Sequence, residues 1–238
     1  MKILALEASA NTVSVCVTND RVLSGEYTIN HKKTHSQTLM PMIEELLNTL
    51  EISLDEIDLI AVSKGPGSFT GLRIGVETAK ALSHGANKPL AGVDTVFAMA
   101  HNFCYADSDT LIAPIMDARR NQVYTGLFLA ENGKIKEEMK TCAIGIDALV
   151  SEIKKSGKNA LFLGDGVLVH KEFLESELGE KAFFAPPNNN MQKASSVAIA
   201  AESYYKDKEY DTYLSLLPEY LRVSQAEREY NEKNKKGE

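Results

Sequence analysis

Two acidic residues each stand where an apolar strand pattern gives way to a short turn. Glu7 and Asp117 both directly follow a run of apolar residues. After each turn the alternation that is typical of a strand resumes, over residues 13–18 and 123–129. Carboxylate oxygens at such positions suit a hard cation such as Mg²⁺. The sequence therefore predicts two acidic hairpins, one in each half of the chain, with cation binding as one use for them.

A glycine-rich turn, Gly65-Pro66-Gly67, joins a short apolar strand pattern to a helix pattern. The helix is expected to begin near Gly71, and either Ser68 or Thr70 can cap it. The same layout can bind phosphate through the amides of a helix N-terminus. The lysine and hydroxyl of a Walker motif are absent, however, which favours a structural turn over a phosphate site.

Histidine and cysteine spacing gives little support for a metal centre. His31 and His35 lie four residues apart, but two lysines stand between them and the glutamate of an H-E-x-x-H zinc motif is missing. The predicted helix begins only near His35, which favours a hydrogen-bonded or capping role for this histidine. The 3 cysteines are widely spaced and form no C-x-x-C pair. We expect no bound metal, and reduced cysteines in a cytoplasmic protein.

Two predicted helices have apolar or small-residue faces that suggest a binding surface. The first, from about Ser36 to Leu50, has a broad amphipathic stripe. The helix after the glycine turn has small residues at intervals of four, which lets another helix approach closely. Ile74 and Ala81 point away from that face, so this helix has more than one apolar face. Surplus apolar helix surface is usually covered by another subunit. The predicted partner-binding residues are His35, Leu39, Met42, Ile43, Leu46, Gly71, Leu72, Gly75, Val76 and Ala79.

Two substitutions on the second helix should prevent pairing between subunits. Val76→Arg or Gly75→Trp would place charge or bulk in a close helix contact between subunits. Either change would then abolish pairing and leave the monomer folded.

The strand pattern of the first half returns about a hundred residues later, which suggests an internal duplication. We predict an α/β fold of two tandem lobes, with mixed sheets flanked by helices. The N-terminal lobe would span residues 1–106 and be completed by a C-terminal helix from about residue 192 to residue 222. The C-terminal lobe would span residues 107–191, and residues 223–238 would form a polar tail.

Composition and charge exclude several classes of protein. The 238 residues are 44% hydrophobic and 25% charged, as in an ordinary globular protein. The net charge of -7, without a basic stripe, argues against direct wrapping of a nucleic-acid backbone. No apolar run approaches the length of a membrane span. We therefore expect a protein without membrane contact, whose role toward any nucleic acid is indirect.

Five motifs resemble those of the TsaB (YeaZ) family, the accessory proteins of bacterial tRNA threonylcarbamoyladenosine synthesis. The most specific is the glycine-turn run GPGSFTGLRIG, from Gly65 to Gly75. The others are ILALEAS at residues 3–9, His35-Ser36, MDARR at residues 116–120 and PEYLR at residues 218–222. Together they span nearly the whole chain and leave only the residues after about Val223 uncovered.

The resemblance implies an actin-like (ASKHA, ribonuclease-H-like) fold, in which two acidic hairpins face each other across a cleft and hold nucleotide phosphates and Mg²⁺. Glutamate replaces the usual aspartate at position 7, and neither hairpin has the paired glycines that let phosphate approach. Since fold alone does not carry function, a vestigial nucleotide pocket is the secondary interpretation. The residues that match such a pocket are Glu7, Ser9, Asp117, Gly164, Asp165 and Gly166.

The same resemblance bears on metal and cofactors. The catalytic paralogue TsaD carries two histidine metal ligands at positions that correspond to Thr95 and Met99 in this chain. Neither threonine nor methionine replaces an imidazole. The transferase metal site is therefore expected to be absent, with ATP and a metal belonging to partner subunits and no cofactor bound here.

The implied function is that of a non-catalytic scaffold subunit that binds and activates TsaD. With the small ATPase TsaE, the complex of the two would transfer threonylcarbamoyl from threonylcarbamoyl-AMP to adenosine next to the anticodon of tRNAs that read codons starting with A. The two helices would pair with those of TsaD, or with a second copy of this chain when TsaD is absent, and tRNA contact would be indirect. Two other functions stay open: a stand-alone actin-like-fold ATPase or kinase that uses Glu7 and Asp117, and a peptidase, which the missing zinc motif disfavours.

Overall fold

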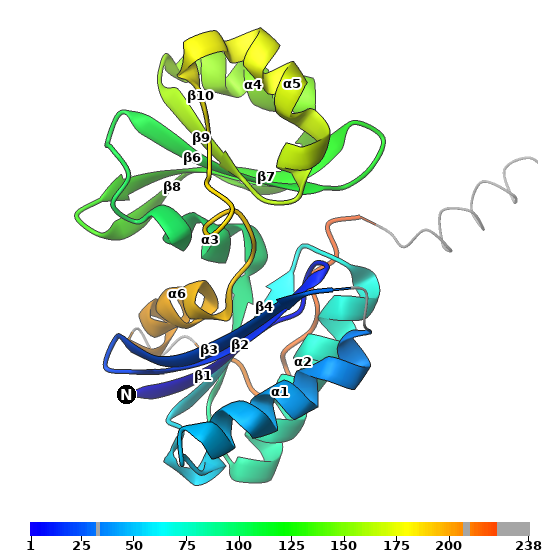
Figure 1. The fold of residues 1–238 in the computed structure, drawn as a ribbon, viewed down its shortest axis with the longest axis vertical. Helices are drawn as coiled ribbons and strands as arrows, with labels where there is room; N and C mark the ends of the chain where they lie inside the picture. Colours follow the sequence, from blue (N-terminus) through cyan, green and yellow to red (C-terminus); the bar gives the residue numbers. More distant parts are fainter. Residues whose placement is uncertain (32–33, 207–209, 223–238) are drawn as a thin grey trace, which may run out of the picture.

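The computed structural model describes residues 1–31, 34–206 and 210–222, and it divides into two lobes (Figure 1). Each lobe is built around one five-stranded sheet with helices packed on it. The predicted α/β fold of two tandem lobes is confirmed. The predicted polar tail, residues 223–238, lies outside the described residues.

The two sheets have the same strand order and the same strand directions. The order is β3-β2-β1-β4-β5 in the first sheet and, read in the same sense, β8-β7-β6-β9-β10 in the second. In each lobe the first three strands pair antiparallel, and the next two continue the sheet in parallel. The predicted duplication is therefore present in the topology. The strands of the first sheet are β1 (Lys2–Glu7), β2 (Thr12–Asn19), β3 (Val22–Asn30), β4 (Leu59–Gly65) and β5 (Leu90–Asp94). Those of the second are β6 (Thr110–Asp117), β7 (Gln122–Glu131), β8 (Lys134–Gly145), β9 (Asn159–Leu163) and β10 (Ala182–Phe184).

Helices cover both faces of the first sheet. Among the described residues, the helices are α1 (His35–Thr49), α2 (Phe69–Ala86), α3 (Thr95–Ala100), α4 (Ile146–Ser156), α5 (Gly166–Leu178) and α6 (Ala194–Lys206). Short 3-10 turns lie at Leu54–Glu56, His101–Phe103 and Gly179–Lys181. The first-sheet layers are α1 and α2 on one face and α6 on the other (Figure 1). Within the described residues, no helix has the length and apolar character that crossing a bilayer requires.

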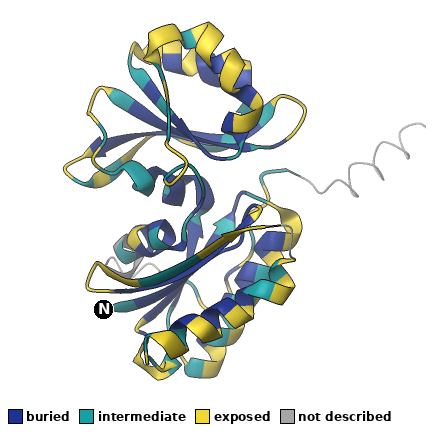
Figure 2. Ribbon diagram, viewed as in Figure 1, coloured by how far each residue is buried: buried dark blue, intermediate teal, exposed yellow. Residues whose placement is uncertain are grey.

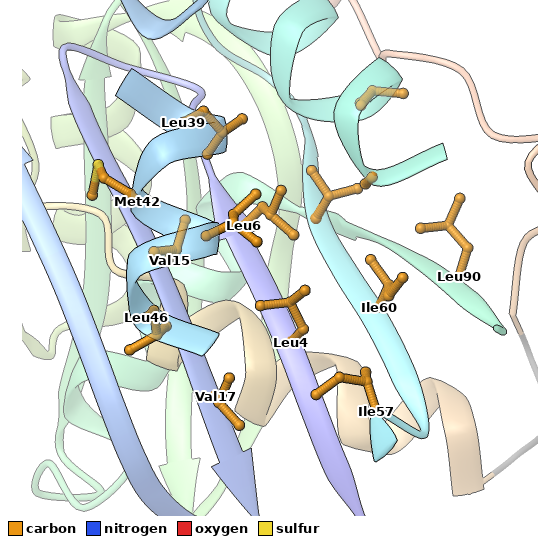
Figure 3. Packing of buried hydrophobic residues seen from close by; sticks show 14 of the residues in the cluster. Leu4, Leu6, Val15, Val17, Leu39, Met42, Leu46, Ile57, Ile60 and Leu90 are labelled. Atoms are coloured by element: carbon orange, nitrogen blue, oxygen red, sulfur yellow. The ribbon is translucent and has the colours of Figure 1, made fainter. Parts of the chain in front are cut away.

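Strand β1 is buried on both faces, which explains its unbroken apolar sequence. Leu4 and Leu6 pack into the cluster under α1 and α2, whereas Ile3 and Ala5 pack into the cluster under α6. Figure 3 shows the first of these clusters, where side chains of α1 interdigitate with those of β1, β2 and β4. Its centre is fully buried, and Leu4, Leu6 and Ile60 have no exposed surface. The apolar stripe of α1 is therefore a core face of the lobe.

Helix α3 joins the lobes through a shared apolar cluster. Val96, Met99 and Ala100 of α3 pack against Ile112 of β6 and Phe128 of β7. All five are at most 1% exposed. Since protein interiors resist deformation, this cluster fixes how one lobe sits on the other.

Beside that cluster, Asp94 makes a polar link between the lobes. Its Oδ1 accepts hydrogen bonds from the Phe97 amide at 2.7 Å and from Oγ1 of Thr141, on β8 of the second lobe, at 3.0 Å. Burial raises the pKa of Asp94 to about 6, the Glu219 carboxylate adds to this shift, and the hydrogen bonds from Phe97 and Thr141 oppose it. This carboxyl therefore titrates well above the range usual for aspartate.

The last described stretch, residues 211–222, returns to the first lobe, and we name it the C-terminal strap. The Asp211 amide donates to the Leu90 carbonyl at 2.7 Å, which extends the free edge of β5. Leu216 is 2% exposed and packs over Gly92, where an added Cβ would lie 2.3 Å from its Cδ1. Arg222 then donates to the carbonyl of Ala118 in the second lobe. The strap is thus bound to both lobes.

The close contact at Gly92 generates a stability prediction. Gly92→Ala should lower the free energy of unfolding by about 1–3 kcal/mol, because the new methyl group must displace Leu216 or distort β5. Gly85→Ala is the matched control, since no atom lies within 4 Å of a Cβ there, and it should stabilise by about 0.4–1 kcal/mol. Urea unfolding followed by circular dichroism measures both. Equal stability of the two variants would contradict the close packing of Leu216 over Gly92.

Asp94 generates a prediction about pH. Its pKa of about 6 in the folded protein exceeds the 3.8 of the unfolded chain, so the folded state holds this proton more tightly. The stabilisation from the protonated carboxyl is complete below pH 3.8 and is lost as the pH rises through about 6, at a cost of about 3 kcal/mol. Asp94→Asn removes this titration. The free energy of unfolding of Asp94→Asn minus that of the wild type should therefore increase between pH 4 and pH 7. A difference that stays constant over this range would show that the pKa of Asp94 is not raised.

Candidate functional site

A groove runs between α1 and α2 on the outer side of the first lobe. It has a volume of about 530 Å³. Both helices pack on the first sheet with their inner sides, and their outer sides are exposed to solvent (Figure 2). The groove is lined by His35, Ser36, Leu39 and Met40 of α1 and by Ile74, Glu77, Thr78, Ala81 and Leu82 of α2.

The N-termini of both helices are held by the first hairpin and the glycine turn. Nε2 of His35 lies 2.7 Å from the Ala10 carbonyl, so the expected hydrogen-bonded histidine is confirmed. Helix α2 begins at Phe69, two residues earlier than predicted, because Ser68 is the cap and accepts a hydrogen bond from the Gly71 amide at 3.4 Å. Pro41 lies inside α1 on its exposed side. Both helix starts are therefore fixed relative to β1.

Most of the predicted partner-binding residues are not on this outer surface, and the prediction is corrected. Leu39, Met42, Ile43 and Leu46 of α1 are between 1% and 7% exposed, because they pack on the lobe's own sheet. On α2, Leu72, Val76 and Ala79 are at most 1% exposed. His35 is half-buried and, with the edge of Leu39, is the part of the predicted set that reaches the groove.

The small-residue face of α2 also has a different neighbour from the expected one. A Cβ at Gly71 would lie 2.2 Å from the Ala8 carbonyl oxygen, and a Cβ at Gly75 would lie 3.2 Å from Cβ of Ala8. These glycines let the turn after β1 approach α2, so another helix has no access to them. Gly75→Trp and Val76→Arg would therefore disrupt the first lobe, contrary to the expectation that the monomer stays folded.

The accessible apolar residues of the helix pair are others. Met40 is 47% exposed, Ala81 is exposed and Ile74 is half-buried. The sequence carried a signal for two of them, since Ile74 and Ala81 lie off the stripe that the core uses. Met40 was not singled out, because it lies in an almost continuous apolar run from Leu39 to Ile43.

The second candidate site is the cleft between the lobes, with a volume of about 410 Å³. It brings together three of the residues predicted for a nucleotide pocket: Ser9, Asp117 and Asp165. The cleft is also lined by the α2 cap region, by Arg119 and Tyr124, and by the strap residues Tyr220, Leu221 and Arg222. Glu7, Gly164 and Gly166 do not line the cleft.

Glu7 is instead an internal strut of the first lobe. It is 1% exposed, and its Oε1 accepts a hydrogen bond from the Ser9 amide at 2.6 Å. Its Oε2 accepts the hydroxyl of Ser63 on β4. Burial raises the pKa of Glu7, although the hydrogen bonds from Ser63 and Ser9 oppose the shift. The predicted role of Glu7 as a ligand in the cleft is corrected, because its oxygens are turned inward and already bonded.

The two glycines beside Asp165 are also structural. A Cβ at Gly164 would lie 2.2 Å from the Ile115 carbonyl oxygen, and one at Gly166 would lie 2.9 Å from it. They let the turn between β9 and α5 pack on β6 and offer no surface on which a base could lie. Asp117 and Asp165 remain close, since the Asp117 amide donates to Oδ1 of Asp165 at 3.3 Å. Burial raises the pKa of Asp165, and the Asp117 carboxylate adds to that shift.

Thr95 and Met99, which the resemblance places at metal-ligand positions of TsaD, lie at the lobe junction. Thr95 has no exposed surface and Met99 is 1% exposed within the apolar cluster of α3. Across the described residues, no group of three or more His, Cys, Asp or Glu side chains is placed to hold a metal ion.

Comparison with known sequences gives two kinds of match. The family model described as TsaD, tRNA N6-adenosine threonylcarbamoyltransferase, matches residues 24–230. The tRNA threonylcarbamoyladenosine biosynthesis protein TsaB of Bacillus subtilis (strain 168) is 34% identical over 235 residues, which cover 99% of this chain and 100% of that protein. TsaB of Escherichia coli (strain K12) is 32% identical over 152 residues, which cover 64% of this chain and 65% of that protein.

Solved structures support the fold. A crystal structure from Pseudomonas aeruginosa, of a protein described as similar to peptidase YeaZ, superposes with a TM-score of 0.78 at 22% identity, covering 93% of this chain and 99% of that chain. The ROK hexokinase of Thermus thermophilus superposes with a TM-score of 0.51 at 12% identity, covering 85% and 99% of the two chains. The two lobes therefore have the actin-like arrangement. The chain belongs to the TsaD family and, within it, to the TsaB (YeaZ) proteins of tRNA threonylcarbamoyladenosine biosynthesis.

Proposed function

We propose that this chain is a non-catalytic scaffold that binds TsaD through the outer side of α1 and α2 and thereby activates it. The observation that carries the proposal is the groove between these helices, where Met40, Ile74 and Ala81 offer apolar surface outside the core. The match to the TsaD family model spans both helices, so TsaD is expected to present a similar helix pair. Similar surfaces on two related chains can pair about a pseudo-two-fold axis.

The proposed complex completes one tRNA modification. Together with TsaE, TsaD would transfer threonylcarbamoyl from threonylcarbamoyl-AMP to adenosine next to the anticodon of tRNAs that read codons starting with A. This chain would supply binding energy and a fixed shape, and tRNA would reach it only through the complex, in keeping with a net charge of -7. In the cytoplasm without TsaD, a second copy of the chain would occupy the same helices.

Ala81 provides the test of the binding face. Ala81→Arg places a charge on the exposed side of α2 and keeps a good helix former there, so folding should be unaffected. Binding to TsaD should weaken at least about tenfold, because the new charge would be buried without a partner. Ala148→Arg is the matched control, since Ala148 is an exposed alanine on α4 of the second lobe. Light scattering and titration calorimetry with purified TsaD give both answers, and undiminished binding by Ala81→Arg would refute the assignment of this face.

The alternative of a stand-alone ATPase or kinase makes an opposite prediction about the cleft. We propose that the isolated chain binds neither ATP nor a metal, because Glu7 is bonded inside the lobe and the α2 turn is packed against the first hairpin. Titration calorimetry with Mg²⁺-ATP should give no saturable heat for the wild type. Asp117→Ala should leave TsaD activation intact. A saturable isotherm that Asp117→Ala abolishes would establish the ATPase alternative; the peptidase alternative has no metal cluster to support it within the described residues.

A further inference from the structure

The C-terminal strap lies along α2 and contacts both of its ends. The ring of Tyr213 packs on His84, near the end of α2, with centroids 4.2 Å apart. The ring of Tyr220 stacks on Phe69, the first residue of α2, at 4.5 Å, and its hydroxyl accepts a hydrogen bond from Nε of Arg73 at 3.2 Å. The strap therefore runs antiparallel to α2 over most of its length.

Helix geometry shows which side of α2 the strap occupies. At about 100° per residue, the strap contacts at Phe69 and His84 fall within about 60° of each other around the helix axis. Ile74 and Leu82, which line the groove toward α1, fall about 140° and 220° from Phe69. Ala81, at about 120°, lies between the two sets. The outer surface of α2 is therefore bordered by α1 on one side and by the strap on the other.

The strap, which borders α2, carries two large exposed apolar side chains. Leu214 is 77% exposed and Leu217 is 68% exposed, whereas Leu216 between them is 2% exposed in the core. The backbone is held as well, because the Glu219 amide donates to the Lys64 carbonyl at 2.6 Å. Leu214 and Leu217 thus stand on a fixed segment and would lose little freedom on binding.

The α1–α2 groove alone is poor in such side chains. Five of its nine lining residues, among them Ser36, Glu77 and Thr78, are polar or carry a single methyl group. Stable interfaces depend on a few large apolar anchors that become fully buried. The strap supplies anchors of this kind where the groove lacks them, and it lies within the stretch that matches the TsaD family model.

We propose that the C-terminal strap is the third element of the TsaD-binding face, with Leu214 and Leu217 as apolar anchors that TsaD covers. This inference rests on the proposed function, since it assigns further residues to the same face. The partner surface required is apolar and lies beside the helix pair of TsaD that contacts α1 and α2.

The test compares two pairs of exposed apolar residues. The double variant Leu214→Ser/Leu217→Ser removes the anchors and leaves Leu216, Tyr213 and Tyr220 in place. The control Leu168→Ser/Val169→Ser changes side chains that are 82% and 60% exposed on α5 of the second lobe. Affinity for purified TsaD is measured by titration calorimetry, and the melting temperature of each variant is recorded beside it. We expect the strap variant to bind at least tenfold more weakly, the control to bind within twofold of the wild type, and both to melt near the wild type.

Each other outcome has a definite meaning. If the wild type binds TsaD and the strap variant binds as tightly, the inference is overturned while the proposed function stands. If the strap variant weakens only self-association of the chain, the strap belongs to the contact between copies and the inference is again overturned. An equal loss in the control variant would refute a specific role for the strap. If the wild type does not bind TsaD, the proposed function fails first, and the inference fails with it.

Discussion

The rest of the structure depends on the close packing of the first hairpin against the glycine turn before α2. The Ser68 amide donates to the Ser9 carbonyl at 2.6 Å, and a Cβ at Gly67 would lie 2.3 Å from that same oxygen. Since only glycine fits so close to a carbonyl, the turn fixes α2 directly on the end of β1. The same hairpin holds α1 through the contact between His35 and the Ala10 carbonyl. One small region therefore places both helices of the proposed binding face.

The lobe junction adds a second constraint. In a fold that binds nucleotide between its lobes, closure needs a hinge that moves. Here α3 is embedded in an apolar cluster shared by both lobes, Asp94 bonds across the junction, and Arg222 of the strap bonds to the second lobe. These contacts favour one fixed lobe arrangement. Such rigidity would suit the proposed scaffold, because binding a preorganised surface costs less ordering entropy.

The fold was largely predictable because its signals are local. Strand alternation, the cap at Ser68 and the repeated acidic hairpin depend on neighbouring residues, and each led to the right element. The partner-binding prediction failed at Leu39 and Val76 because a periodic stripe shows that a helix buries one face but does not show what covers it. The lobe's own sheet covers it here. The PEYLR motif marked part of the strap but not where it packs, since one anchoring contact joins Asp211 to Gly92, 119 residues away, and Leu216 belongs to no periodic pattern.

Under the proposed scaffold role, the difference from an enzyme of this fold would depend on a few positions. Thr95 and Met99, which the family resemblance places at metal-ligand positions of TsaD, are both buried here, and Met99 belongs to the apolar cluster at the lobe junction. Glu7 connects the first acidic hairpin to β4, because its side chain, longer than that of aspartate, accepts a hydrogen bond from the Ser63 hydroxyl. None of these changes alters the strand order or the packing of α1 and α2. A chain can thus lose the chemistry of the cleft and keep the outer helix pair, since the cleft and the helix pair lie on different sides of the same hairpin.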